Sequence, residues 1–226
     1  MLFRVFSLFA FAQITCNCVL GQDRPTFADS PAYKEAYELI CDLPERIRKA
    51  ERLLLANGTR TLRELSANEL TLLCRAYNEL AEHDKQLAAA QELWGRFPER
   101  PAATRWIVNS KLNLLETQND CDRAIDFADS ALKDGRGIRS NLLLLKAEAL
   151  LRKSAVPDAT KRVMVSDLLI EAYATYEEIP GGEEVGDLGN TDIIDLNPSF
   201  SLFFSFAERE TLKLRMKNAR KVKAKR

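Results

Sequence analysis

The sequence predicts an all-α protein, and three observations support this fold class. Along most of the chain, apolar side chains recur at steps of three and four residues, which is the spacing of one helical face. No stretch alternates apolar and polar residues over a useful length, as half-buried strands do. Several segments also carry helix signals, such as the capping box Ser66-x-x-Glu69, which starts a helix, and Asn57-Gly58, which ends one.

Length, composition and charge are those of an ordinary soluble protein. Of the 226 residues, 46% are apolar and 29% are charged, and 33 basic groups balance 33 acidic ones. A chain of this length can bury one continuous core, so we expect one structural unit. The zero net charge gives no argument for a nucleic acid or an acidic surface as partner. The charge is nevertheless unevenly distributed, because residues 22–211 carry a net charge of −9 and residues 212–226 hold eight basic residues and no acidic one.

The first 21 residues are predicted to be an export signal peptide. Arg4 precedes an apolar run over residues 5–20, which polar residues follow. Val19 and Gly21 place small side chains before the expected cleavage after Gly21, so we expect a periplasmic or secreted protein.

Two alternatives to a cleaved signal peptide remain open. One is an uncleaved membrane anchor, although the run has about 16 residues where a span wants about 20. The other is a lipoprotein acylated at Cys16 or Cys18.

Residues 22–29 are expected to be a linker, and residues 30–65 a divergent pair of helices. Ser30 followed by Pro31 is typical of a helix start, and Pro44 opens the second helix. Asn57-Gly58 then ends the pair.

Two stretches that lie 38 residues apart repeat one pattern of apolar residues, a turn and an alanine-rich second helix. The first copy carries Leu70, Leu73, Cys74, Tyr77, Leu87, Ala90, Leu93 and Pro98. The second carries Val108, Leu112, Leu115, Ala124, Ala128, Ala131, Leu132 and Gly135. A third, degenerate copy begins near Ser140, and an insertion that contains Pro157 is expected to displace its second helix to residues 167–180.

Residues 66–180 therefore resemble tetratricopeptide repeats (TPRs), with residues 121–132 as the closest match. The resemblance implies a short right-handed α-solenoid of antiparallel helix pairs, in which alanines let the two helices of a pair cross closely. Gln86 departs from the family, which usually has a small alanine at that position. The alternative is a non-repetitive helical bundle whose similarity to the repeats arises by chance.

Three further segments are expected after the repeats. Residues 181–197 are Gly-rich and acidic with no basic residue, which indicates an exposed loop. Residues 198–216 are expected to form a capping helix, since the open end of a solenoid needs a cover and this helix is rich in phenylalanine. Its phenylalanines are Phe200, Phe203, Phe204 and Phe206. Docking to a partner is the alternative use of this cluster. Residues 217–226 form a basic tail.

The sequence holds no pattern typical of a catalytic, cofactor or metal site. It lacks a Gly-rich phosphate loop, Gly-x-Ser-x-Gly and His-Glu-x-x-His, and His83 is the single histidine. The cysteines show no metal-ligand spacing. We therefore expect no enzyme activity, no cofactor and no metal.

The resemblance places candidate partner-binding residues on the first helix of each pair, because in this family these helices line the concave side. That face would carry Asn68, Thr71, Arg75 and Asn78 from one helix and Trp106, Asn109, Asn113 and Glu116 from the next. Each set falls on one stripe of its helix. We expect the amides to hydrogen-bond the backbone of an extended peptide while Trp106 covers its side chains. A stripe that merely faces solvent is the alternative.

The basic tail gives a second candidate surface, suited to anionic lipid or a cell-envelope polymer. Its charged residues are Lys217, Arg220, Lys221, Lys223, Lys225 and Arg226. They have no aromatic residues between them, so we expect no sequence-specific nucleic-acid binding. An unstructured solubilising end is the alternative. The sequence thus predicts an exported TPR-like adaptor or scaffold for a protein or peptide, with a membrane- or envelope-associated assembly factor as the alternative.

Overall fold

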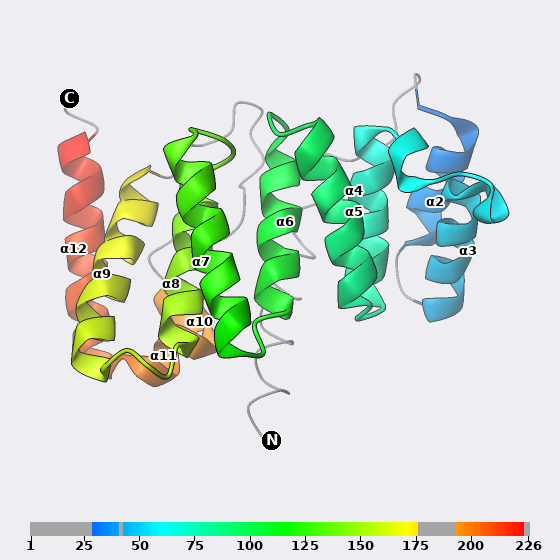
Figure 1. The fold of residues 1–226 in the computed structure, drawn as a ribbon. Helices are drawn as coiled ribbons and strands as arrows, with labels where there is room; N and C mark the ends of the chain where they lie inside the picture. The colour runs from blue at the N-terminus through cyan, green and yellow to red at the C-terminus, as the bar shows by residue number, and fades with distance from the viewer. Residues whose placement is uncertain (1–28, 41–42, 176–192, 224–226) are drawn as a thin grey trace. The chain divides into compact units, whose positions relative to one another are not determined.

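A computed structural model describes residues 29–40, 43–175 and 193–223 (Figure 1). Every regular element in these residues is a helix, which confirms the all-α class. The described residues fall into two compact units, whereas the length had predicted one. The N-terminal unit ends at Lys111 and the C-terminal unit begins at Leu112. The predicted signal peptide, most of the linker and most of the acidic segment lie outside the described residues.

The N-terminal unit is built from consecutive helices and two short 3-10 turns. They are α2 (Pro31–Leu39), α3 (Pro44–Leu54), η1 (Ala56–Gly58), η2 (Leu62–Glu64), α4 (Ala67–Glu79), α5 (His83–Arg96) and α6 (Pro101–Asn113). The last two residues of α6 already belong to the C-terminal unit. Helix α2 packs on α3, α3 on α4, and α4 on α5. Only Leu80, Ala81 and Glu82 separate α4 from α5, and Ala81 takes a positive φ of 54° to make the turn.

Local start signals determine where several of these helices begin. The Ser30 hydroxyl accepts a hydrogen bond from the Tyr33 backbone N–H at 3.1 Å, which caps α2 as the sequence predicts. At the start of α4, the Ser66 hydroxyl accepts from the Glu69 N–H and Glu69 Oε2 accepts from the Ser66 N–H at 2.8 Å. Burial raises the pKa of the Glu69 carboxyl, but hydrogen bonds from Arg60 and Ser66 outweigh it and hold that pKa below its usual value.

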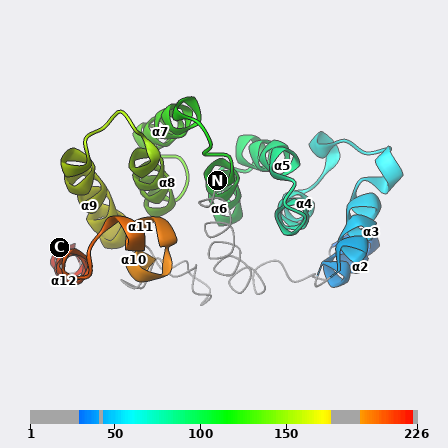
Figure 2. The ribbon, with the colours of Figure 1, turned by 90° about the horizontal axis from the view of Figure 1, so that it is seen from below.

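The C-terminal unit contains three long helices from residue 118 onward, two short ones and a long last helix. They are α7 (Gln118–Lys133), α8 (Arg139–Arg152), α9 (Asp158–Thr175), α10 (Ile193–Leu196), α11 (Pro198–Phe203) and α12 (Phe206–Lys223). Figure 2 shows α8 between α7 and α9, and α12 beside α9, in agreement with the packing contacts. The core of this unit joins side chains from five of these helices. They include Leu144, Ala147, Val165, Leu169, Ile194, Phe200, Phe204, Leu212 and Met216.

The structure corrects three boundaries that the sequence predicted in the C-terminal unit. Helix α9 begins at Asp158, directly after Pro157, so this proline precedes a helix instead of marking an insertion up to residue 167. Residues 193–196, assigned to the acidic loop, form α10, because Ile194 is fully buried in the core. The helix expected over residues 198–216 is two helices, and the second continues to Lys223, into the segment assigned to the tail.

Another capping box explains the break between α11 and α12. The Ser205 N–H donates to Glu208 Oε2 at 2.7 Å, and the Ser205 hydroxyl accepts from the Glu208 N–H. Arg209 reaches back to the carbonyls of Ser201 and Phe204, at 2.6 and 3.0 Å, and so satisfies the end of α11. Within the phenylalanine cluster, Phe200 and Phe204 are buried.

Candidate functional site

Arg75, in the middle of α4, is buried without a counter-ion. Its side chain is 8% exposed, and it makes no hydrogen bond or ion pair with any described residue. Its Nε is completely shielded from solvent and has no acceptor in the described part of the chain. Because a guanidinium stays charged at any physiological pH, this leaves a full positive charge without an anion beside it.

Each of the other buried charged side chains in the described residues has a partner of opposite charge. Glu69 pairs with Arg60 at 2.9 Å, and Lys161 lies 3.6 Å from Asp158. Glu148 lies 3.8 Å from Arg152 and also accepts a hydrogen bond from the Asn197 side chain. Burying a charge costs free energy unless a partner compensates it. Arg75 is therefore the buried charge, among those described, for which the described residues supply no partner.

A network of amides lies in the same unit as Arg75. Gln86 on α5 is fully buried, and its Nε2 donates to Asn109 Oδ1 of α6 at 2.7 Å and to Asn78 Oδ1 of α4 at 3.3 Å. This explains why a large polar residue stands where the TPR pattern has alanine, since the Gln86 amide joins three helices. Two of the predicted partner-binding residues, Asn78 and Asn109, are thus hydrogen-bonded within the chain.

The remaining residues of the predicted stripe are placed as follows. Thr71 is buried, and its hydroxyl donates to the Ala67 carbonyl of its own helix at 2.8 Å. The Asn68 amide donates to Asp29 at 3.2 Å. Trp106 on α6 is also buried. The partner-binding role of these residues stays a prediction.

Glu116 does not extend the stripe as the sequence predicts, whereas Asn113 is the last residue of α6. Helix α6 ends at Asn113, so Glu116 lies beyond it in an exposed connection and is not on the helical face. Both residues belong to the C-terminal unit, whereas Trp106 and Asn109 belong to the N-terminal one. The site that the N-terminal unit presents by itself therefore centres on Arg75 and the amides of Asn78, Gln86 and Asn109.

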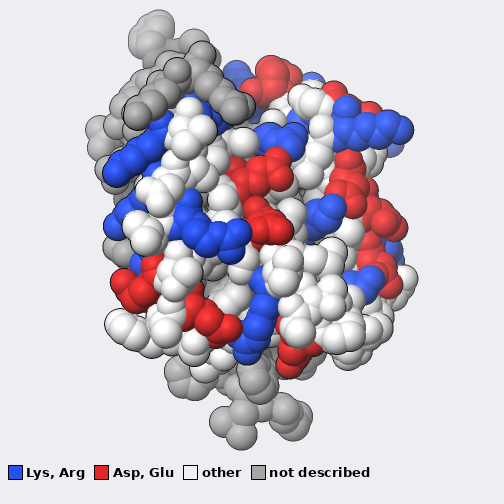
Figure 3. Space-filling model, turned by 90° about the vertical axis from the view of Figure 1, so that its left-hand side faces the viewer, with Lys and Arg blue, Asp and Glu red and all other residues white. Residues whose placement is uncertain are grey.

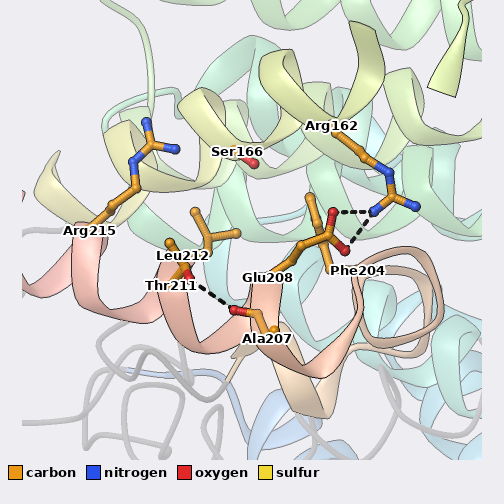
Figure 4. Close-up of a pocket in the computed structure, with 8 residues that line it drawn as sticks. All are labelled: Arg162, Ser166, Phe204, Ala207, Glu208, Thr211, Leu212 and Arg215. Carbon is orange, nitrogen blue, oxygen red and sulfur yellow. Dashed lines mark hydrogen bonds and ion pairs between the residues drawn. The ribbon is translucent and has the colours of Figure 1, made fainter. Parts of the chain in front are cut away.

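A pocket of about 300 Å³ lies between α9 and α12 in the C-terminal unit (Figure 4). Its lining residues are Arg162, Ser166, Phe204, Ala207, Glu208, Thr211, Leu212 and Arg215. Arg162 Nη1 donates to both carboxylate oxygens of Glu208 at 2.9 Å, and Arg215 lies 3.3 Å from Asp167. Hydrogen bonds from the hydroxyl and backbone of Ser205, together with Arg162, hold the pKa of Glu208 below its usual value. Both arginines of this pocket are thus already neutralised by carboxylates.

The predicted basic tail is mostly helical. Lys217, Arg220, Lys221 and Lys223 lie on α12, whereas Lys225 and Arg226 lie outside the described residues. Arg220 lies over the Tyr173 ring, 5.3 Å from its centroid. Figure 3 views the side of the molecule where α12 and α9 lie, and shows basic side chains interspersed with uncharged and acidic ones.

Three further features of the described residues concern metal binding, membrane spans and cysteines. No group of three or more His, Cys, Asp or Glu side chains gathers there in a way that would hold a metal ion. None of the described helices is both long enough and apolar enough to cross a membrane. Cys74 and Cys121 are buried thiols, and burial raises the pKa of Cys121.

Comparisons of the chain with protein-family models, with curated proteins and with solved structures find no match.

Proposed function

We propose that the protein is an exported TPR-like adaptor, which binds a segment of a partner protein through the first helices of its helix pairs. The observation that carries this proposal is Arg75, a buried cation with no anion in the described chain. A guanidinium binds a carboxylate through two parallel hydrogen bonds. The partner segment accordingly carries an acidic side chain or a C-terminal carboxylate that meets Arg75.

The repeat architecture is part of the same proposal. Two of the three sequence copies coincide with packed pairs of consecutive helices, α4 with α5 and α8 with α9. The second helices carry fully buried alanines, Ala89 and Ala90 on α5 and Ala128 on α7, where a close helix crossing needs small side chains. We propose that the pairs stack as a short right-handed solenoid. Helix α12, which packs on α9 and buries Leu212 and Met216, would cap its end.

Binding suits the chemistry around Arg75 better than catalysis does. The polar groups on the neighbouring helix faces are the amides of Asn78, Gln86 and Asn109 and the hydroxyl of Thr71. Amides and hydroxyls donate and accept hydrogen bonds but do not exchange protons near neutral pH. Asn78, which is half-buried, would help to hold the backbone of a bound segment while Arg75 takes its charge.

A peptide-display selection on the full-length protein tests the proposal. We expect the selected peptides to share an acidic residue or a free C-terminus, and the Arg75→Gln variant to bind them about tenfold to a hundredfold more weakly. Arg63→Gln is the matched control, because Arg63 is exposed and its loss changes the net charge equally. Selected peptides without a shared carboxylate, or unchanged affinity in Arg75→Gln, would rule out the proposed site.

A further inference from the structure

The outward side of α12 combines apolar and basic side chains. The opposite side of this helix buries Leu212 and Met216 in the core of the C-terminal unit. Leu214 and Val222 are 61% and 57% exposed. Lys217 and Lys221 follow Leu214 by three and seven residues, so the three side chains share one face. The side that does not pack on the protein is therefore itself amphipathic.

Three lysines in the last two turns of α12 have no partner among the described residues. Lys217 and Lys221 lie on the outward side, whereas Lys223, nine residues after Leu214, lies on the opposite side. Lys217, Lys221 and Lys223 are exposed, and none of them forms an ion pair or hydrogen bond with the described residues. Lys213, by contrast, pairs with Asp195 and Glu210, and Arg215 pairs with Asp167. The chain has no acidic residue after Glu210. Three cations near the end of the helix are thus available to an outside anion.

Exposed apolar side chains also gather at this end of the unit. Seven large apolar side chains are exposed in the described residues, and six of them lie on α9, α11 and α12. These are Val163, Met164, Leu202, Phe206, Leu214 and Val222. Acidic side chains also appear in Figure 3. Asp167, Asp195 and Glu208, on or near α9 and α12, each pair with a basic residue.

We propose that the outward side of α12 binds the surface of an anionic lipid bilayer, with Leu214 and Val222 at the level of the headgroups and Lys217 and Lys221 against their phosphates. Helices that lie in a membrane interface join a lysine-rich face to aliphatic side chains in this way. An 18-residue helix is about 27 Å long, so α12 would rest parallel to the surface over several turns. The inference concerns a different unit from Arg75 and does not depend on the adaptor proposal.

Three other occupants fit the same face less well. Lysine is depleted at protein interfaces, where Arg and aromatic residues are enriched, so an acidic protein is a poorer match. A second copy of the face would set two lysines against two lysines. A nucleic-acid backbone would neutralise the lysines but would offer no apolar phase to Leu214 and Val222.

Co-sedimentation of the full chain with vesicles tests the inference. The vesicles contain either phosphatidylcholine alone or phosphatidylcholine with about a third phosphatidylserine, each at low and high salt. Neutral vesicles report any binding through the apolar residues 5–20, which all variants share. We expect tighter binding to the anionic vesicles, weakened by salt. The variant K217Q/K221Q should bind them about 25-fold more weakly, at about fivefold per lysine.

Two matched variants separate the face from net charge and from general hydrophobicity. R52Q/R100Q removes the same charge from exposed sites elsewhere and should bind like the wild type. L214S/V222S should lose about tenfold, whereas L43S, at another exposed leucine, should lose nothing. Equal binding to neutral and anionic vesicles, equal losses in K217Q/K221Q and R52Q/R100Q, or binding to polyglutamate but not to vesicles would each overturn the proposal.

Discussion

The side chain of Asn197 joins the start of α11 to Glu148 on α8. Its amide nitrogen donates to Glu148 Oε1, while its Oδ1 accepts from the Ser199 backbone N–H at 2.9 Å. Both side chains are 1% exposed. One asparagine thus caps a helix and ties it to another helix that lies 49 residues earlier in the chain.

Glu148 should make stability fall as the pH rises. Burial raises the pKa of this carboxyl, so the folded state holds the proton more tightly than the unfolded state does. The contribution of Glu148 is complete below the ordinary carboxyl pKa and is lost as the pH rises through its raised folded value. We expect Glu148→Gln to remove this loss, as urea unfolding from pH 4 to pH 8 would show.

A control separates the effect of Glu148 from that of carboxylates whose pKa the fold lowers instead of raises. Arg48, for example, lowers the pKa of Glu82 to about 2, so that group stabilises the fold above the ordinary carboxyl pKa and loses its effect in acid. The wild-type and Glu148→Gln curves share these groups, and their difference should grow with pH. Asp126→Asn, at an exposed residue of the same unit, is the matched control substitution.

Replacing Gln86 with the alanine that TPRs favour should destabilise this protein. The Gln86 amide donates to Asn109 and to Asn78, so its loss leaves two polar groups short of a partner and opens a space among three helices. We expect Gln86→Ala to lower the free energy of unfolding by about 3 kcal/mol. Gln91→Ala, at an exposed position of the same helix, should change it by less than about 0.5 kcal/mol in the same denaturant titration. A Gln86→Ala variant as stable as the wild type would contradict the structural role of the amide network.

Phe200 and Leu202 should respond differently to the same substitution. Both lie on the short helix α11, but Phe200 is fully buried in the core and Leu202 is exposed. Phe200→Ala should cost about 3 to 5 kcal/mol, whereas Leu202→Ala should be nearly neutral in thermal or chemical unfolding. Similar losses in both variants would mean that α11 does not pack on the core as the structure describes.

The sequence signals that predicted the structure correctly are local ones. Apolar periodicity identified the all-α class, and Ser30 and Ser66 marked helix starts because the atoms that form a cap lie within three residues of each other. The break before α12 was also local, since Ser205-x-x-Glu208 is a capping box, but the surrounding phenylalanines favoured one uninterrupted helix.

The features that were missed depend on distant residues. Helix α10 forms within an acidic stretch because Ile194 packs into a core made by α8, α9, α11 and α12. From the sequence, Gln86 is only a departure from the repeat pattern. Its hydrogen bond to Asn109, 23 residues further on, is found only in the structure. Arg75 could be assigned to a helical face from its spacing, but its burial and the lack of a counter-ion for it among the described residues follow only from the packing.

Removal of the Arg75 charge should stabilise the protein while it weakens partner binding. A buried cation without an anion costs free energy, so Arg75→Met, which keeps an unbranched stem, should raise the free energy of unfolding by about 1 kcal/mol. Thermal unfolding of the unliganded protein would detect this as a higher midpoint. Arg63→Met, at an exposed arginine, should shift stability by less than about 0.5 kcal/mol. If Arg75→Met instead destabilises the unliganded protein by more than about 1 kcal/mol, the guanidinium has a stabilising role within the fold, and the reason for assigning it to a partner's carboxylate is lost.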